Sequence, residues 1–520
     1  MFCFWVSGVV AITFASMFVR QKKNKSGVIS VQVIDKSRGR YRVKKTLGSS
    51  SDLSVVEELL RQGHLFIDQY KGQPALDFIL GDDDHYYQSI YDNIKQVQLL
   101  GPELVLGKLF NAIGFNAIKD DLFRHLVIAR IVYPVSKLKT AAYLHQYKGI
   151  SIDVNELYRY LDKLQQGQIK QVKQISYEHT IKILGGQLSI VFYDVTTIYF
   201  EAEQEDELRK TGFSKDGKHQ QPQIVLGLLV SENGYPLDYE IFEGDKFEGH
   251  TMLPVVEAFK EKYQLQQLIV VADAGLMSNK NIEELTNKGY DYIIGARIKN
   301  ETQAITNQLL ALTLEDGKSI AIQRSILQRI IISYSESRAK NDAHNREKGM
   351  ERLKKQLAKG KLTKQHINNR GYNKYLKLEG EIKITFDEQK YEADAKWDGL
   401  KGYLTNTALS KETVINYYKQ LWQIEKAFRI SKTDLRIRPV YHYKKRRIEA
   451  HICIAFAACK LYKELERQLK EQQSKLSPEK VIDILKTIYG LTVQVPHSRE
   501  YRLMLLDKTQ EQKEILKMFP

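Results

Sequence analysis

Residues 189–194 read SIVFYD and residues 268–273 read LIVVAD, two short apolar runs that each end in an aspartate. Uninterrupted apolar runs of this length are typical of strands that are buried on both faces of a sheet. In an open sheet, ligands bind beyond the carboxyl ends of the strands. We therefore expect Asp194 and Asp273 to lie together at one edge of a sheet. Two neighbouring carboxylates repel one another, and a bound divalent cation such as Mg²⁺ relieves that repulsion.

The segments around these two runs predict the rest of the sheet. Residues 223–231 (QIVLGLLVS) and 237–242 (LDYEIF) read as strands separated by an Asn-Gly turn, which is a strong hairpin signal. Residues 252–263 and 281–288 have helical periodicity, and 292–296 (YIIGA) reads as a strand. Three antiparallel strands followed by parallel strands with crossover helices is the layout of an RNase H-like sheet. The predicted fold class is therefore α/β, with an RNase H-like mixed sheet.

The composition indicates a globular protein with a polyanionic partner. The chain has 520 residues and a formal net charge of +16, and 43% of its residues are hydrophobic, which excludes a disordered or collagen-like chain. A basic balance favours nucleic acid or an anionic membrane surface as partner. Three cysteines are too few for a disulfide framework, so a reducing compartment is expected.

The N-terminus has three interpretations. Residues 1–19 are almost wholly apolar and RQKKNK follows, so a transmembrane segment is one of them. A secretory signal is the second, but no basic region precedes the apolar run. The third is that translation starts at Met17 and that residues 1–16 are a start-site artefact. We prefer the third interpretation, because nothing later in the chain is typical of a secreted protein, and we expect no membrane association.

A helix expected over residues 416–432 (NYYKQLWQIEKAFRISK) supplies a third carboxylate, Glu425. At about 100° per residue, five side chains of this helix fall within one narrow stripe. They are Tyr418, Trp422, Glu425, Arg429 and Lys432. The alternative is a structural helix in which Trp422 packs in the core and Glu425 bonds to Arg429 one turn later.

The spacing Tyr418-x2-Leu421-x3-Glu425-x6-Lys432 resembles the Y-x2-R-x3-E-x6-K signature of bacterial insertion-sequence DDE transposases. The segments FYDVTTIYFE and VVADAGLMS are similar to the two aspartate motifs of that family, and RPVYHYKKRRIEAHI after the glutamate helix is similar too. The resemblance covers roughly residues 18–465. The chain departs from the signature at Leu421, which stands where the family has arginine, and Arg429 is the candidate replacement.

The resemblance implies a DNA transposase that binds element ends and catalyses strand cleavage and strand transfer of the cut-and-paste type. It implies that Asp194, Asp273 and Glu425 hold two Mg²⁺ ions, with Mn²⁺ as an alternative, about 4 Å apart. Tyr418 and Lys432 would contact the terminal phosphates of the element. Trp422 would stack on an unpaired base, unless it packs in the core.

The implied partner is double-stranded DNA, both the terminal inverted repeats and the target, bound by a homodimer in the synaptic complex. The implied location is the bacterial cytoplasm, in association with the nucleoid. The 152 positions from Asp273 to Glu425 imply an inserted subdomain, which similar transposases carry as a largely β insertion. Within it, residues 338–377 hold thirteen Lys or Arg against three Asp or Glu, a charge pattern that indicates an exposed basic helix. DNA phosphates are its expected ligand, and a helix face that is merely solvated is the alternative.

The predicted organisation has seven parts. They are 1–16, the possible start-site artefact; 17–50, a basic β-hairpin; 51–185, a helical and DNA-binding region; 186–300, the first part of the RNase H-like sheet; 301–405, the inserted basic subdomain; 406–465, the second part with the glutamate helix; and 466–520, a helical tail.

Three rival functions stay open from the residues alone. An RNase H-like nuclease or resolvase would share the metal ions but not strand transfer. A haloacid-dehalogenase-like phosphatase would need a second aspartate where Thr196 stands. A transposase-derived DNA-binding protein would have lost its carboxylates, which are present here. A zinc site at His451, Cys453 and Cys459 is not favoured, because the surrounding helix is apolar and buried thiols are expected.

Overall fold

The computed structural model describes residues 17–519 except 37–39, 71–90, 203, 215–216, 277, 364–365, 369–370, 380–382 and 496–499. The proposed start-site artefact, residues 1–16, lies outside the described residues. The chain forms two compact units, Met1–Ile94 and Lys95–Pro520. Within the described ranges, no helix has both the length and the apolar content needed to cross a bilayer.

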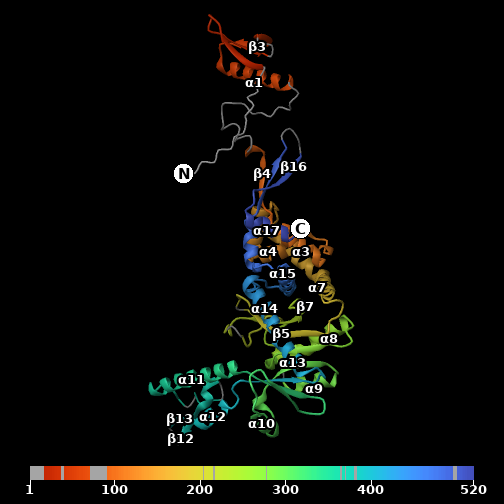
Figure 1. Ribbon diagram of the computed structural model, residues 1–520, viewed down its shortest axis with the longest axis vertical. Coiled ribbons are helices and arrows are strands. Elements are labelled where there is room, and N and C mark those ends of the chain that lie inside the picture. Colours follow the sequence, from red (N-terminus) through yellow and green to blue (C-terminus); the bar gives the residue numbers. More distant parts are fainter. Residues whose placement is uncertain are drawn as a thin grey trace. The chain divides into compact units, whose positions relative to one another are not determined.

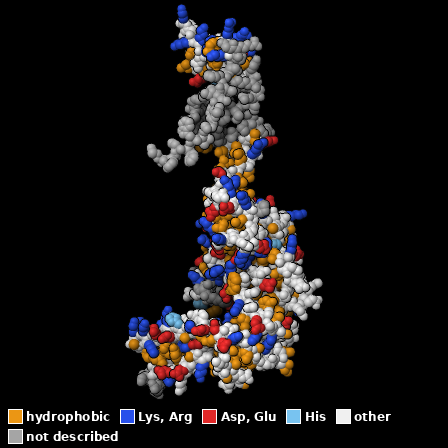
Figure 2. All heavy atoms as spheres, viewed as in Figure 1, with side chains coloured by type: hydrophobic (Ala, Val, Ile, Leu, Met, Phe, Trp, Pro, Cys, Tyr) orange, Lys and Arg blue, Asp and Glu red, His pale blue; other side chains and the backbone are white. Residues whose placement is uncertain are grey.

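The described residues of the first unit form an antiparallel three-stranded sheet with one helix. Its elements are β1 (Met17–Lys23), β2 (Ile29–Asp35), β3 (Arg42–Ser50) and α1 (Leu53–Tyr70), with strand order β1-β2-β3. Strands β2 and β3 correspond to the predicted hairpin, whereas β1 was not predicted, because its apolar start merges with the apolar residues before it. Helix α1 packs on the sheet, so it groups with the strands rather than with the later helices. Lys and Arg side chains are prominent on the surface of this unit (Figure 2).

A helical layer opens the second unit. Its elements are β4 (Ile94–Leu99), α3 (Gly101–Ile113), α4 (Asp121–Val132), α5 (Lys137–Lys148), α6 (Val154–Lys163) and α7 (Ile169–Ile183). These helices contribute apolar side chains to one large core that also includes the long late helix α15 (Lys445–Glu471). The helical character that periodicity predicts for this region is found, together with the additional strand β4.

An eight-stranded mixed sheet forms the centre of the second unit (Figure 1). Its strands are β5 (Ile190–Tyr199), β6 (Gln223–Ser231), β7 (Pro236–Glu243), β8 (Ile269–Ala272), β9 (Asp291–Ala296), β10 (Ser319–Gln323), β11 (Arg329–Tyr334) and β14 (Leu400–Thr405), in the order β10-β11-β14-β9-β8-β5-β6-β7. β5, β6 and β7 are antiparallel neighbours, and β5, β8 and β9 are parallel neighbours. These are the strand directions that the sequence pattern predicts for the first five strands.

Each face of the sheet carries its own helices, and alternate residues of a strand point to opposite faces. One face packs with α8 (Met252–Lys262), α9 (Asn279–Asn287) and α10 (Gln303–Leu310). The opposite face packs with α13 (Lys411–Lys419), α14 (Trp422–Arg429) and α15. Val191 on β5 belongs to the first of these cores and Phe192 to the second.

The segment from 301 to 405 differs from the expected largely β insertion. Strands β10, β11 and β14 extend the main sheet instead of forming a separate layer. Between β11 and β14 lie α11 (Glu336–Ala358), a two-stranded sheet of β12 (Leu376–Glu379) and β13 (Lys383–Phe386), and α12 (Glu388–Ala395). Helix therefore outweighs strand, because the basic run forms a helix of 23 residues that buries only Gly349, Met350 and Leu353.

The tail from 466 to 520 is helical only in part. Helix α15 continues to Glu471, followed by α16 (Pro478–Leu485), the hairpin of β15 (Tyr489–Gln494) and β16 (Tyr501–Leu505), and α17 (Gln510–Met518). The hairpin joins β4 in a three-stranded sheet, a long-range pairing that local periodicity does not reveal. Cys453 and Cys459 are buried in α15 as free thiols, which confirms the prediction of core cysteines.

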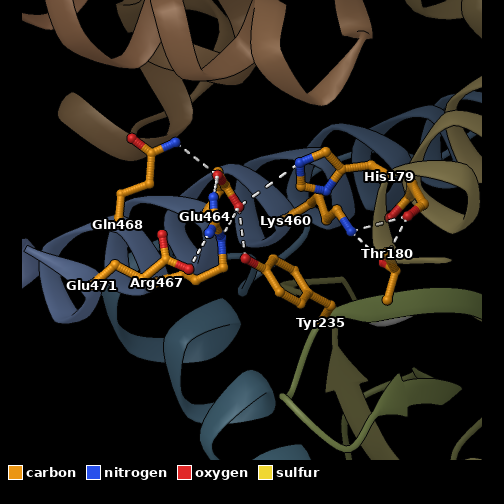
Figure 3. A network of polar contacts seen from close by, with 9 residues as sticks. His179, Thr180, Tyr235, Lys460, Glu464, Arg467, Gln468 and Glu471 are labelled. Atoms are coloured by element: carbon orange, nitrogen blue, oxygen red, sulfur yellow. Dashed lines mark hydrogen bonds and ion pairs between the residues drawn. The ribbon is translucent and has the colours of Figure 1, made fainter. Parts of the chain in front are cut away.

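A buried polar network ties α15 to α7 and to the turn before β7 (Figure 3). The Lys460 ammonium is fully buried and donates to the carbonyl of Ser176 on α7 at 2.9 Å. One turn later, the Glu464 carboxylate accepts from the Tyr235 hydroxyl at 2.6 Å. The network therefore fixes two successive turns of the long helix, the first against α7 and the second against the turn before β7.

Candidate active site

Asp194 lies on β5, and Asp273 is the first residue after the neighbouring parallel strand β8. The pairing of β5 with β8 runs from Ile190–Ile269 to Tyr193–Ala272, so the next pair in register is Asp194 with Asp273. Adjacent strands lie about 4.8 Å apart. Continued by one residue, this register brings the two aspartates to adjacent positions. Asp194 does not end its strand, however, because β5 remains paired with β6 as far as Tyr199.

Both aspartates face the side of the sheet that α13, α14 and α15 cover. Phe192 on β5 and Val271 on β8 belong to the core on that side, and the aspartates follow each of them by two residues. Helix α14, which carries Glu425, contacts β5 and β6 on this same side. The three predicted carboxylates thus come from two strands and from the helix that covers them.

Asp273 has a direct partner in Tyr418 on α13. The Tyr418 hydroxyl donates to Asp273 Oδ1 at 2.8 Å, and the ring is 6% exposed. Burial, reinforced by the Asp273 charge, raises the pKa of Tyr418, which keeps the phenol protonated as a donor. Gly295 on β9 leaves room for this contact, since a Cβ built there would lie 2.5 Å from the hydroxyl oxygen.

Lys401 on β14 supplies a cation beside the carboxylates. Its Nζ lies 4.7 Å from the centre of the Tyr418 ring. Burial and the charge of Arg338 lower the pKa of Lys401, while Asp273 and Glu425 oppose that change. Lys401 therefore interacts electrostatically with both Asp273 and Glu425.

The predicted stripe of five side chains is interrupted. Helix α13 ends at Lys419, and the amides of Gln420 and Leu421 bond to carbonyls three residues back, which tightens the chain into a turn before α14 begins. After α14 the backbone widens into a π-helical turn at Ile430–Asp434, which contains Lys432. A regular helical period across 416–432 is therefore wrong, because the turn spacing changes twice.

The members of the stripe have different environments. Tyr418 and Leu421 are buried, whereas Glu425 and Arg429 are exposed and Lys432 is intermediate. Trp422 is 48% exposed, so the alternative that placed it in the core is wrong. Leu421, at the signature arginine position, packs in the core at the turn between α13 and α14.

The three predicted carboxylates have the oxygen donors that a divalent cation needs. Carboxylate oxygens are the ligands that Mg²⁺ prefers, and two aspartates in register with a third carboxylate opposite would supply them. Over the described residues, no group of three or more His, Cys, Asp or Glu side chains lies close enough to hold a metal ion. The three carboxylates therefore do not form a closed metal site in the described part of the chain.

A cleft of about 720 Å³ opens from Asp273 toward the segment between β11 and β14. We call it the carboxylate cleft. Its lining includes six cationic side chains: Arg297, Lys299, Arg338, Arg346, Lys374 and Lys401. Figure 2 shows Lys and Arg side chains on the nearby surface that α11 forms. Four of these six cations pair with aspartates that also line the cleft: Lys299 and Lys374 with Asp394, Arg346 with Asp398, and Arg338 with Asp342. With Asp273 included, the lining therefore holds six cations and four carboxylates, a small excess of positive charge.

Replacing Gly295 with alanine is expected to disturb the Tyr418–Asp273 contact. The new methyl group overlaps the Tyr418 hydroxyl, so we expect a loss of about 1–3 kcal/mol in the free energy of unfolding, as for other overpacked sites. In a Tyr418→Phe background the overlap with the hydroxyl is absent, and the same replacement should cost less. Urea unfolding of the two single variants and the double variant measures this coupling. If the losses of the two single variants add up to that of the double variant, Gly295 is not required for the Tyr418 contact.

Sequence reasoning missed Lys401 and Gly295. A weak signal exists for Lys401, since LKGYLT is a strand in which a lysine takes the same parity as the buried Tyr403. A charged residue on the core side of a strand usually has a specific role. Nothing near Gly295 in the sequence indicates its role, because the side chain for which it leaves room, Tyr418, lies more than a hundred residues later.

Comparison with known proteins assigns the family. Residues 185–460 match the transposase DDE domain, and because this match covers more than half of the chain, the protein belongs to that family. No curated protein sequence matches the chain. The family assignment confirms, at the level of class, the resemblance to DDE transposases.

Two solved structures show a distant likeness. A piggyBac transposase synaptic complex with hairpin DNA is 9% identical, covers 75% of this chain and 79% of its own, and has a TM-score of 0.37. A Mos1 transposase paired-end complex with the left transposon end is 12% identical, covers 47% and 71%, and has a TM-score of 0.16. At this distance neither structure assigns a role to a residue of this chain.

Proposed function

We propose that the protein is a cut-and-paste DNA transposase of a bacterial insertion sequence, which binds element ends and catalyses metal-dependent strand cleavage and strand transfer. The observation that carries the proposal is the register match of Asp194 with Asp273 on the sheet face that the Glu425 helix covers. Membership of the transposase DDE domain family supports it. The order β7-β6-β5-β8-β9 supports an RNase H-like sheet as the catalytic scaffold.

In this proposal Asp194, Asp273 and Glu425 hold two Mg²⁺ ions, which Mn²⁺ can replace. Bound ions of this kind activate an oxygen nucleophile and stabilise the leaving oxygen of an in-line phosphoryl transfer. Tyr418 fixes the orientation of Asp273 through its hydrogen bond, in addition to the expected contact with a terminal phosphate. Lys401 partly compensates the carboxylate charge before any ion binds.

The exposed side of α14 and the π turn after it form the proposed DNA contact. Trp422 presents an exposed ring that can stack on an unpaired base, and exposed Arg429 can contact a phosphate. Lys432 contributes a charge to the same contact. The partner is double-stranded DNA, both terminal inverted repeats and target, held by a homodimer in the synaptic complex. The proposed location is the bacterial cytoplasm, with the nucleoid.

A test of this proposal uses the full chain with DNA carrying the inverted repeats that flank its gene. Cleavage at the ends should require Mg²⁺ or Mn²⁺ and stop on addition of EDTA, and a target plasmid should yield joined products. DNA of the same composition with scrambled ends is the control. Cleavage without joining would favour the nuclease or resolvase alternative, and metal-independent cleavage would contradict the carboxylate site.

A further inference from the structure

A second cleft, of about 520 Å³, lies between the loop that joins α4 to α5 and the segment that leads into α15. We call it the Arg130 cleft. Five cationic side chains contribute to its lining: Arg130, Lys137, Lys139, Arg436 and Arg438. The described residues that line it include neither Asp nor Glu. Among the described lining residues, the charged side chains are therefore all basic.

Two of these cations are buried and lack partners. Arg130 is 6% exposed and Lys137 is 5% exposed. In the part of the chain that the structure describes, neither side chain makes a hydrogen bond or an ion pair. Burial lowers the pKa of Arg130 to about 10, and burial together with the Arg130 charge lowers that of Lys137. Buried charges are ordinarily paired, so this pair indicates an anion supplied from outside.

The charges of Arg130 and Lys137 also act on two buried histidines, His442 and His451. The rings of His442 and His451 lie 5.3 Å apart, and His451 Nε2 donates to the carbonyl of Ile437 at 2.9 Å. The other ring nitrogen of His451, Nδ1, is buried with no hydrogen-bond partner among the described groups. Burial, followed by the charges of Lys137 and Arg130, lowers the pKa of His442 to about 3. Both rings are therefore neutral, and the described residues supply no ion pair to Arg130 or Lys137 beside them.

The N-terminus of α5 faces the same cleft. Ser136 caps this helix of twelve residues, and the lining includes Ser136 to Lys139. The backbone N–H groups and dipole of a helix N-terminus favour an anion. A guanidinium adds a planar fork of donors and an ammonium adds a point charge, a combination that matches the oxygens of a phosphate group.

We propose that the Arg130 cleft binds a phosphate group of the DNA backbone, at a site separate from the three carboxylates. The cleft follows the end of β5, because Val440 pairs with Phe200, six residues beyond Asp194. Six residues of extended strand span roughly 20 Å, about six base pairs of duplex. One duplex can therefore reach both places. The identity of the phosphate as DNA rests on the proposed transposase function, whereas the affinity for phosphate does not.

The surface beside the cleft favours an extended polyanion over a free phosphate ion. Tyr441 and Tyr443 flank the buried His442 and are 60% and 65% exposed. Exposed Lys444 and Lys445 follow directly. Phosphates that continue beyond the cleft would meet these two lysines, which a single free phosphate could not reach.

Thermal unfolding with inorganic phosphate tests the site without DNA or catalysis. At constant ionic strength, phosphate should raise the Tm of the full chain, because a ligand that binds only the folded state stabilises it. Lys137→Met and Arg130→Met should each have a higher Tm than the parent without phosphate, since a buried repulsion is removed, and should lose most of the phosphate response. Lys119→Met, which removes an exposed lysine before α4, should keep the response in full.

DNA binding at several salt concentrations identifies the source of the phosphate. In Lys137→Met the slope of log K against log salt should be shallower by about one than in Lys119→Met, the change expected for one lost phosphate contact. A phosphate response that is equal in all variants would overturn the site. A lost phosphate response with an unchanged salt slope would overturn the DNA assignment and leave free phosphate as the ligand. Neither measurement depends on cleavage, so both can be interpreted whether or not Asp194, Asp273 and Glu425 prove to be catalytic.

Discussion

Replacing Asp273 with asparagine is expected to lower the rate of strand cleavage by about 10³-fold or more while DNA binding is retained. Asparagine has the same shape, and its carbonyl oxygen can still accept the Tyr418 hydrogen bond, so the fold should persist. The loss arises because metal-assisted phosphoryl transfer draws several kcal/mol from the ions that the carboxylates hold, and about 4 kcal/mol corresponds to 10³-fold. Asp194→Asn and Glu425→Gln should have effects of the same size.

Asp291→Asn is the matched control for this experiment. Asp291 pairs with Ile269 at the start of β8, four residues before Asp273. It therefore lies at the amino-terminal end of these parallel strands, whereas Asp273 follows their carboxyl-terminal end. Replacement of Asp291 should leave cleavage unchanged. Single-turnover cleavage of end DNA, with binding measured in parallel, gives both quantities. Full activity in Glu425→Gln, with both aspartate variants inactive, would remove Glu425 from the site and direct attention to another third ligand.

The sequence predicts the centre of the sheet well because the information there is local. Each signal there is short: the apolar runs before Asp194 and Asp273, and the Asn-Gly turn. The short turn between β6 and β7 predicts an antiparallel pair, and the helical connection between β8 and β9 predicts a parallel pair. The register that aligns the two aspartates also follows from those runs. The continuation of β5 past Asp194 does not, since it depends on pairing with β6 along its full length.

The helix that carries Glu425 shows where local reasoning ends. A pattern of 3.6 residues per turn predicts one stripe, but the burial of Leu421 and Tyr418 against the sheet tightens the chain between α13 and α14. Tertiary packing therefore moves Tyr418 to the carboxylates and leaves Trp422 exposed. The Arg130 cleft is equally hidden in the sequence, because its cations come from regions three hundred residues apart.

Replacing Glu464 with alanine is expected to reduce the free energy of unfolding by about 3–5 kcal/mol, the usual cost of removing one partner of a buried charge network. Glu464 is 1% exposed and accepts hydrogen bonds from Tyr235 at 2.6 Å, from Arg467 Nε at 3.0 Å and from Gln468 at 2.8 Å (Figure 3). His179 Nε2 lies 3.8 Å from the same carboxylate. The loss of the Glu464 carboxylate leaves the buried Tyr235 hydroxyl without its acceptor.

Glu471→Ala separates this effect from the simple loss of an ion pair. Glu471 bonds to the same Arg467 but is 61% exposed, so its replacement should cost only about 0–1 kcal/mol. Urea unfolding of both variants measures the difference. Equal effects would show that the buried network adds no more to stability than a surface pair.

The pH dependence of Glu464→Ala provides a second readout. Burial alone would raise the pKa of Glu464, but the hydrogen bonds from Arg467, Tyr235 and Gln468 outweigh it and hold the pKa below its ordinary value of 4.5. A carboxyl whose pKa is lowered by folding stabilises the protein above pH 4.5, and this contribution is lost as the pH falls through the folded-state pKa. The parent should therefore lose stability below pH 4.5 more steeply than Glu464→Ala, and the free energies of the two proteins should converge. Parallel acid profiles would mean that folding does not lower the pKa of this carboxyl group.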